Sequence, residues 1–119
     1  MSKKPRTITL TNAAPVRVEE DAWPVIAAGH WHSGEYDFQA NYVDSIRVRQ
    51  HADGRSIVYA VCDSGPGGAP QGWTGRRGGE VLPAGADLVA AIRRVGSGCG
   101  VEESAIRECI ADLPAVDLE

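Results

Sequence analysis

The stretch that decides the fold is YVDSIRVRQHADGRSIVYAVC, residues 42–62. Two runs rich in β-branched residues flank the dipeptide Asp53-Gly54. Glycine accepts the positive φ that a tight turn between paired strands demands. The sequence therefore predicts a β-hairpin whose turn contains Asp53 and Gly54.

Alternation along the first run of this hairpin separates apolar from basic residues. Ile46 and Val48 share one side of an extended chain, and Arg47 and Arg49 share the other. We expect the first side to be core and the opposite side to be a cationic surface.

The residues before the hairpin contain two further patterns. Residues 6–11 alternate polar and apolar, which predicts a strand behind a flexible basic tail over residues 1–5. Residues 19–28 begin with three acids and continue with apolar residues, an order that favours the start of a helix. We therefore expect a short N-terminal helix over 19–28.

The residues after the hairpin change in composition twice. Residues 63–79 contain seven Gly and two Pro, so we expect a long, mobile loop that belongs to the working surface. Apolar residues at helical spacing then predict helices over 86–95 and 102–112, joined by a glycine turn at 96–100. The expected fold is α+β: a small antiparallel sheet with a central β-hairpin, packed by a short N-terminal helix and a C-terminal helical hairpin.

Length and composition indicate one domain over 1–119. No apolar stretch approaches the roughly 18 residues of a membrane span, and the first residues lack the apolar segment of a signal peptide. The three cysteines, Cys62, Cys99 and Cys109, are odd in number and form no C-x-x-C pair. This pattern favours reduced, buried thiols and a cytoplasmic location.

Charge alternates in blocks along the chain. The net charge is +4 over 1–18, −6 over 19–44, +3 over 45–97 and −5 over 98–119. A continuous basic footprint is absent, which argues against direct nucleic-acid binding as the main task. The acidic blocks instead favour a surface that complements a basic partner.

Three motif hypotheses fail on their residues. The last predicted helix would follow a glycine turn, as in a helix-turn-helix, but its acids would repel phosphate. The glycine-rich stretch matches no phosphate-loop pattern. A metal site could use His30, His32, His51, Asp53 and Asp63, but their spacing does not select for one. We therefore predict no catalytic residue, no cofactor and no metal.

The residue types most enriched at binding hot spots are Trp and Arg. On that ground the expected partner-binding residues are Trp31, Trp73, Arg76 and Arg77. Carboxylates at the rim of an interface speed association, which adds Glu102 and Glu103 to the set.

Several segments resemble short accessory proteins of conjugative plasmids and integrative elements. They are VRVEEDAWPVI (16–26), RQHADGR (49–55), RGGE (77–80), AGADL (84–88), AIRRVG (91–96) and IRECIADLPAV (106–116). Small proteins of such mobile genetic elements look like host-defence inhibitors more often than like metabolic enzymes, and anti-CRISPR and anti-restriction proteins are examples. The resemblance implies no catalytic residues, and it favours a non-catalytic protein-binding module that inhibits a host nucleic-acid-processing defence complex.

Two alternatives stay open. A small DNA-binding regulator of the element would use Lys3, Lys4 and Arg6 together with Arg47 and Arg49. A His/Asp-dependent metal enzyme would need the three histidines to converge. The sequence does not indicate whether the protein is a monomer or a dimer.

Overall fold

The computed structural model describes residues 5–8, 15–32, 41–65 and 74–114. Over these residues the fold is α+β, with a two-stranded and a four-stranded antiparallel sheet and a pair of helices. In chain order the elements are β1 (Pro5–Ile8), β2 (Val16–Glu19), β3 (Val25–His32), β4 (Asn41–Gln50), β5 (Ser56–Gly65), β6 (Thr74–Leu82), α1 (Leu88–Cys99) and α2 (Glu103–Asp112).

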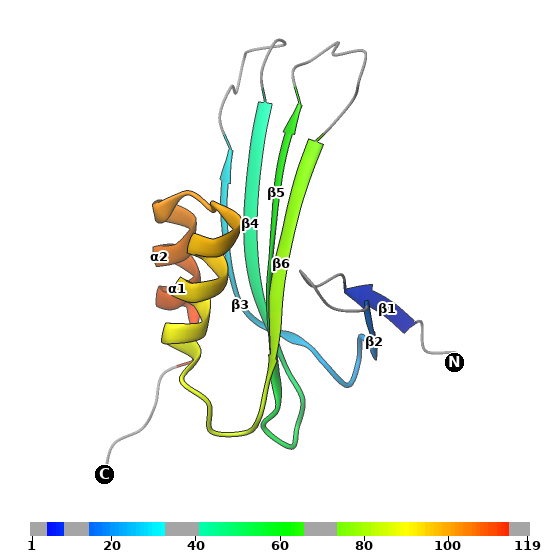
Figure 1. Ribbon diagram of the computed structural model, residues 1–119. Helices are drawn as coiled ribbons and strands as arrows, with labels where there is room; N and C mark the ends of the chain where they lie inside the picture. Colours follow the sequence, from blue (N-terminus) through cyan, green and yellow to red (C-terminus); the bar gives the residue numbers. More distant parts are fainter. Residues whose placement is uncertain (1–4, 9–14, 33–40, 66–73, 115–119) are drawn as a thin grey trace.

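The four-stranded sheet, in the order β3-β4-β5-β6, forms the middle layer. The helices α1 and α2 cover one of its faces, and β1 and β2 lie on the other side (Figure 1). The strands extend beyond both covering layers at the end where β3 stops and β4 begins (Figure 1).

The predicted hairpin is confirmed. β4 and β5 pair throughout their length, and Arg49 stands opposite Ile57 next to the turn. The His51 N–H donates to the Arg55 carbonyl over 2.9 Å, and Gly54 has a φ of 96°. Glycine is needed at this position because side chains rarely tolerate that φ.

Each face of the sheet has its own hydrophobic core. The larger core lies under the helices and includes Ile46, Val48 and Val58, all fully buried. The smaller core lies under β1 and β2 and contains Ile8, Val18, Trp23, Ile57 and Tyr59.

The prediction that Arg47 and Arg49 form a cationic surface is wrong for Arg49. Arg49 is only 6% exposed, and its guanidinium donates to the Trp23 carbonyl and to the Tyr59 hydroxyl, each over 2.9 Å. Arg47 is half-buried. A guanidinium enters an apolar layer when such hydrogen bonds replace those to water.

The N-terminal helix predicted over 19–28 is wrong. Residues after Glu19 form a turn, in which the Trp23 N–H donates to the Glu19 carbonyl over 3.1 Å, and β3 begins at Val25. Ala27 and Gly29 face the larger core, and β4 supplies the hydrogen bonds of the strand. Pairing with a distant strand overrides the local acidic signal.

The loop predicted over 63–79 is also wrong over part of its length. β5 continues to Gly65, and β6 begins at Thr74 and pairs with β5 from Ser64 to Ser56. Residues 66–73, and with them the predicted mobility of that segment, lie outside the described residues.

The flexible tail predicted over residues 1–5 is wrong at Pro5, which belongs to β1. Residues 1–4 and 9–14 lie outside the described residues.

The C-terminal helical hairpin is confirmed, but α1 begins and ends later than predicted and α2 begins one residue later. α1 continues through the predicted glycine turn to Cys99, and Gly100, with a φ of 84°, ends it. Gly96 is buried, and a Cβ there would lie 2.7 Å from the Ile106 side chain, so this glycine lets the two helices approach. Within the described part of the chain, neither helix is long and apolar enough to span a membrane.

Candidate functional site

Two carboxylates of α2 reach the backbone of the edge strand β3. Glu108 Oε1 accepts a hydrogen bond from the His30 N–H over 2.8 Å, and Asp112 Oδ2 accepts one from the Ala28 N–H over 3.0 Å. These two N–H groups point away from β4, where an edge strand would otherwise be open to pairing. The acids of α2 thus close this edge of the sheet.

Gly29, between those two residues, allows the helix to come this close. A Cβ at this position would overlap the Ala105 carbonyl and lie 2.8 Å from the Cys109 nitrogen, both in the backbone of α2. A larger residue would therefore push the helix away from the strand and break both carboxylate contacts.

The two acids predicted to meet a partner have contacts within the fold. Glu102 caps α2, since its Oε2 accepts from the Ser104 N–H over 2.7 Å and also contacts the Ser104 hydroxyl. The hydrogen bonds from Ser104 lower the pKa of Glu102, with a smaller contribution from Arg107. Glu103 forms ion pairs with Arg107 at 3.1 Å and Arg93 at 3.5 Å.

A buried carboxylate fixes the start of the same helix. Asp44 is 8% exposed, and its Oδ2 accepts from the Glu102 N–H over 2.8 Å. This bond ties β4 to the N-terminus of α2, where a negative charge is favourable.

The remaining predicted binding residues are not brought together. Trp31 is half-buried and packs against the larger core, on the helix-covered face. Arg77 is exposed on β6, at a position whose side chain lies on the opposite face. Arg76 belongs to β6, but its side chain is not among those described, and Trp73 lies outside the described residues.

The face opposite the helices presents a row of residues that sequence reasoning missed. The strand registers align His30, Ser45, Val61 and Arg77 across β3 to β6, and we call these four residues the open row. His30 and Arg77 are exposed, and Ser45 and Val61 are half-buried. Half-buried Arg47 stands in the next row, beside Tyr59. The alternation in β4 predicted Arg47 on this face, but the partners in β3 and β6 depend on register.

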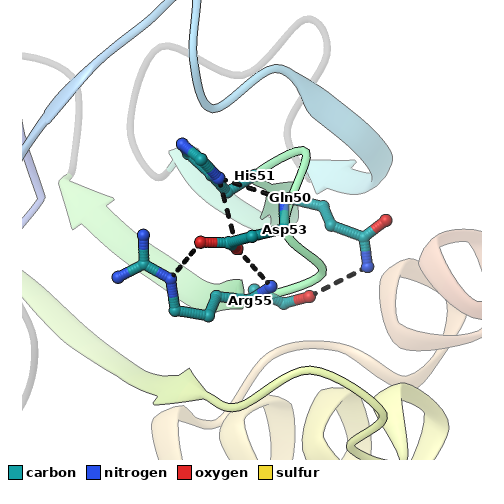
Figure 2. Close-up of polar contacts among 5 residues, drawn as sticks. Gln50, His51, Asp53 and Arg55 are labelled. Atoms are coloured by element: carbon teal, nitrogen blue, oxygen red, sulfur yellow. Dashed lines mark hydrogen bonds and ion pairs between the residues drawn. The ribbon is translucent and has the colours of Figure 1, made fainter.

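A polar cluster surrounds the turn between β4 and β5 (Figure 2). Asp53 accepts from the Arg55 N–H over 3.0 Å and from Arg55 Nε over 2.8 Å, and it faces His51 Nδ1 at 3.2 Å. Chiefly through the backbone N–H of Arg55, these contacts lower the pKa of Asp53. The ring of Trp23 adjoins both His51 and Arg55: its centroid is 5.1 Å from that of His51 and 5.2 Å from the Arg55 guanidinium carbon. The cluster orders the turn.

The histidines considered as ligands of a metal site are not brought together where their side chains are described. His30 stands opposite Ser45, whereas His51 follows the last residue of β4. At about 3.3 Å per residue the two positions are separated by roughly 20 Å. Across residues 5–8, 15–32, 41–65 and 74–114, no three His, Cys, Asp or Glu side chains form a group that could hold a metal ion.

All three cysteines are buried. Desolvation, with smaller contributions from Asp112 and Glu108, raises the pKa of Cys109 to about 12. A thiol with this pKa stays protonated at neutral pH and is a poor nucleophile.

An apolar hollow of about 450 Å³ lies where α1 begins and α2 ends. Its lining includes Ile26, Leu88, Val89, Leu113 and Pro114. Val89 of α1 is 41% exposed here.

Comparison with protein-family models, curated proteins and solved structures finds no match to this chain.

Proposed function

We propose that this protein is a non-catalytic protein-binding module whose working surface is the sheet face opposite α1 and α2. The observation that carries the proposal is the open row together with Arg47. Two arginines and a histidine border the small or apolar side chains of Ser45 and Val61 on one strand-built surface.

Such a surface fits a protein partner that presents carboxylates. Guanidinium groups bind carboxylates through paired hydrogen bonds, and β-strands hold the side chains at fixed spacing. Residues on paired strands lose little freedom on binding, which lowers the entropic cost of association. The partner's carboxylates would lie over Arg47 and Arg77, and its apolar residues over Val61.

A role in inhibiting a host nucleic-acid-processing defence complex is supported by the resemblance to mobile-element proteins. Three acids of the acidic surface that the sequence suggested for this role have contacts within the fold. Glu108 and Asp112 accept hydrogen bonds from β3, and Glu103 is paired with arginines. The role is tested by plasmid transformation of cells with and without an active CRISPR or restriction system. Expression of the protein should raise transformation only where the system is active.

Photo-crosslinking tests the binding module directly. A photoreactive residue at position 61 on the sheet face is compared with one at position 107 on α2, in cells of the native host. We expect protein adducts from position 61. Double substitution Arg47→Gln/Arg77→Gln should abolish them, whereas the matched Arg93→Gln/Arg107→Gln should not. Adducts from position 107 alone, or no protein adduct from either position, would overturn the proposal.

The alternative function, DNA binding, would also use Arg47 of the proposed protein-binding surface. Of the two hairpin arginines assigned to it, Arg49 is buried and hydrogen-bonded, so Arg47 is the one near the surface. Fluorescence anisotropy with duplex DNA at low salt separates the two functions. Binding that falls steeply with salt, and is lost in Arg47→Gln/Arg77→Gln, would replace the protein partner with DNA.

A further inference from the structure

The two edges of the four-stranded sheet differ in their contacts with the helices. At β3, carboxylates of α2 accept hydrogen bonds from the outward N–H groups of Ala28 and His30. The strand at the other edge is β6, which is nine residues long and, among the strands that the structure describes, pairs only with β5. A long edge strand is a template on which a further strand can pair.

The hydrogen-bond alternation identifies which groups of β6 face outward. The His51 to Arg55 bond closes the hairpin, so odd-numbered residues of β4 and β5 bond to each other. Even-numbered residues of β5 therefore bond to even-numbered residues of β6, which stand opposite them. The amide groups of Gly79 and Val81 consequently point away from β5.

The side chain of Val81 on β6 is exposed. Val81 is 50% exposed, the highest value among the large hydrophobic residues in the described part of the chain. Its side chain lies on the face opposite the helices, next to its outward amide.

The charges along β6 are complementary to those of an antiparallel copy. Arg76 and Arg77 lie in its first half and Glu80 in its second. A two-fold axis at Gly78 sets Glu80 opposite Arg76, and sets Arg77 opposite Gly79. Moving the axis to Arg77 would set two arginines opposite each other, which is unfavourable.

On the helix-covered face, α1 holds the Glu80 carboxylate in place. Its carboxylate accepts from Arg94 Nε over 2.7 Å and from Nη2 over 2.6 Å, so it is held on the sheet by α1. These hydrogen bonds lower the pKa of Glu80 and keep the carboxylate charged. Because position 78 carries glycine, the two residues at the axis bring no side chains against each other on the helix-covered face.

We propose that β6 pairs antiparallel with β6 of a second copy of this chain, about a two-fold axis at Gly78. The two four-stranded sheets then form one continuous sheet of eight strands. The hydrogen bonds involve the outward groups of Gly79 and Val81, and the register is the one that sets Arg77 opposite Gly79 rather than opposite a second arginine. This inference is independent of the proposed function, because it concerns the purified chain alone.

Sedimentation velocity over a wide concentration range tests the pairing. The wild type should dimerise, and Val81→Lys should raise the dimer Kd by roughly tenfold or more, because lysine on an edge strand opposes pairing. The matched control is Val25→Lys, since Val25 is also exposed, at 42%, but lies on the edge that α2 closes. A wild type that stays monomeric, or equal effects of the two lysines, would overturn the inference.

Disulfide trapping tests the register. Chains carrying Arg77→Cys are mixed with chains carrying Gly79→Cys, since the three native thiols are buried. The heterodimeric disulfide should form under mild oxidation, and faster than the disulfide between two Arg77→Cys chains. Equal rates would exclude an axis at Gly78.

Discussion

Arg49 donates from Nε to the hydroxyl of Tyr59 over 2.9 Å, and both residues are buried, at 6% exposed. The guanidinium lies in the smaller core and donates to the Trp23 carbonyl as well. This pair joins the turn before β3 to the central hairpin, so it holds the layer of β1 and β2 against the sheet.

Tyr59→Phe removes one acceptor from this buried cation. We expect the free energy of unfolding to fall by about 1–3 kcal/mol, because a charged donor is left with one partner fewer. Urea unfolding measures the change. In a double-mutant cycle with Arg49→Met, the two effects should not add, and strict additivity would show that the hydrogen bond contributes nothing.

Gly29→Ala tests the close approach of α2 to β3. The new Cβ meets helix backbone, which cannot turn aside, so we expect a loss of about 3 kcal/mol or more. Gly98→Ala is the matched control, because a Cβ there meets nothing within 4 Å. Alanine inside a helix should stabilise that variant by about 0.5–1 kcal/mol. Thermal unfolding should therefore shift in opposite directions for the two variants.

Glu108→Ala should open the edge of β3, whereas Glu108→Gln keeps an oxygen that can accept the His30 N–H. Native-state hydrogen exchange at His30 should therefore accelerate in the alanine variant and stay close to wild type in the glutamine variant. The alanine variant should also lose about 0.5–1.5 kcal/mol of stability. If exchange at His30 were accelerated equally in both variants, relative to wild type, the charge of Glu108 and not its hydrogen bond would protect this strand.

The Glu80 to Arg94 pair predicts a dependence of stability on pH. The pKa of Glu80 lies below its ordinary value of 4.5 in the folded protein, first because of the hydrogen bonds from Arg94. The stabilisation is therefore complete above pH 4.5 and is lost as the pH falls through the lowered pKa. Arg94→Gln should reduce this acid sensitivity, as measured by urea unfolding between neutral and acid pH. Profiles of the same slope for the two proteins would contradict the assignment.

Cys109 should resist alkylation in the folded protein at mildly alkaline pH. Its thiol is buried and has a pKa of about 12, so almost no thiolate is present. Mass spectrometry after iodoacetamide treatment measures modification at this residue, with the urea-unfolded protein as control. Rapid modification of the folded chain would show that the helix-facing core opens more readily than the packing indicates.

The hairpin and the C-terminal helices could be predicted because their signals are local. Asp53 and Gly54 mark the turn, and the apolar spacing marks the helices, whose Ile106, Ile110 and Leu113 pack in or against the larger core. Residues 19–28 carry a local signal for a helix, yet β3 forms because β4 and α2 provide partners far away in the sequence.

The same distinction applies to the candidate site. Charge counting identified the acids of the last helix but could not show that Glu108 and Asp112 point at the backbone of β3. Glycine content argued against a strand at β6, whereas pairing with β5 imposes one. The open row joins four strands, so its composition follows from register rather than from any single segment.

The closure of the outer edge of β3 by Glu108 and Asp112 also affects how the chain folds during synthesis. Its hydrogen bonds span 78 and 84 residues, from His30 to Glu108 and from Ala28 to Asp112. β3 leaves the ribosome first among the strands of its sheet, but its outer edge stays open until α2 has emerged. A nascent chain paused after β6 would thus expose both edges at once, the moment at which chaperones and neighbouring nascent chains compete for it.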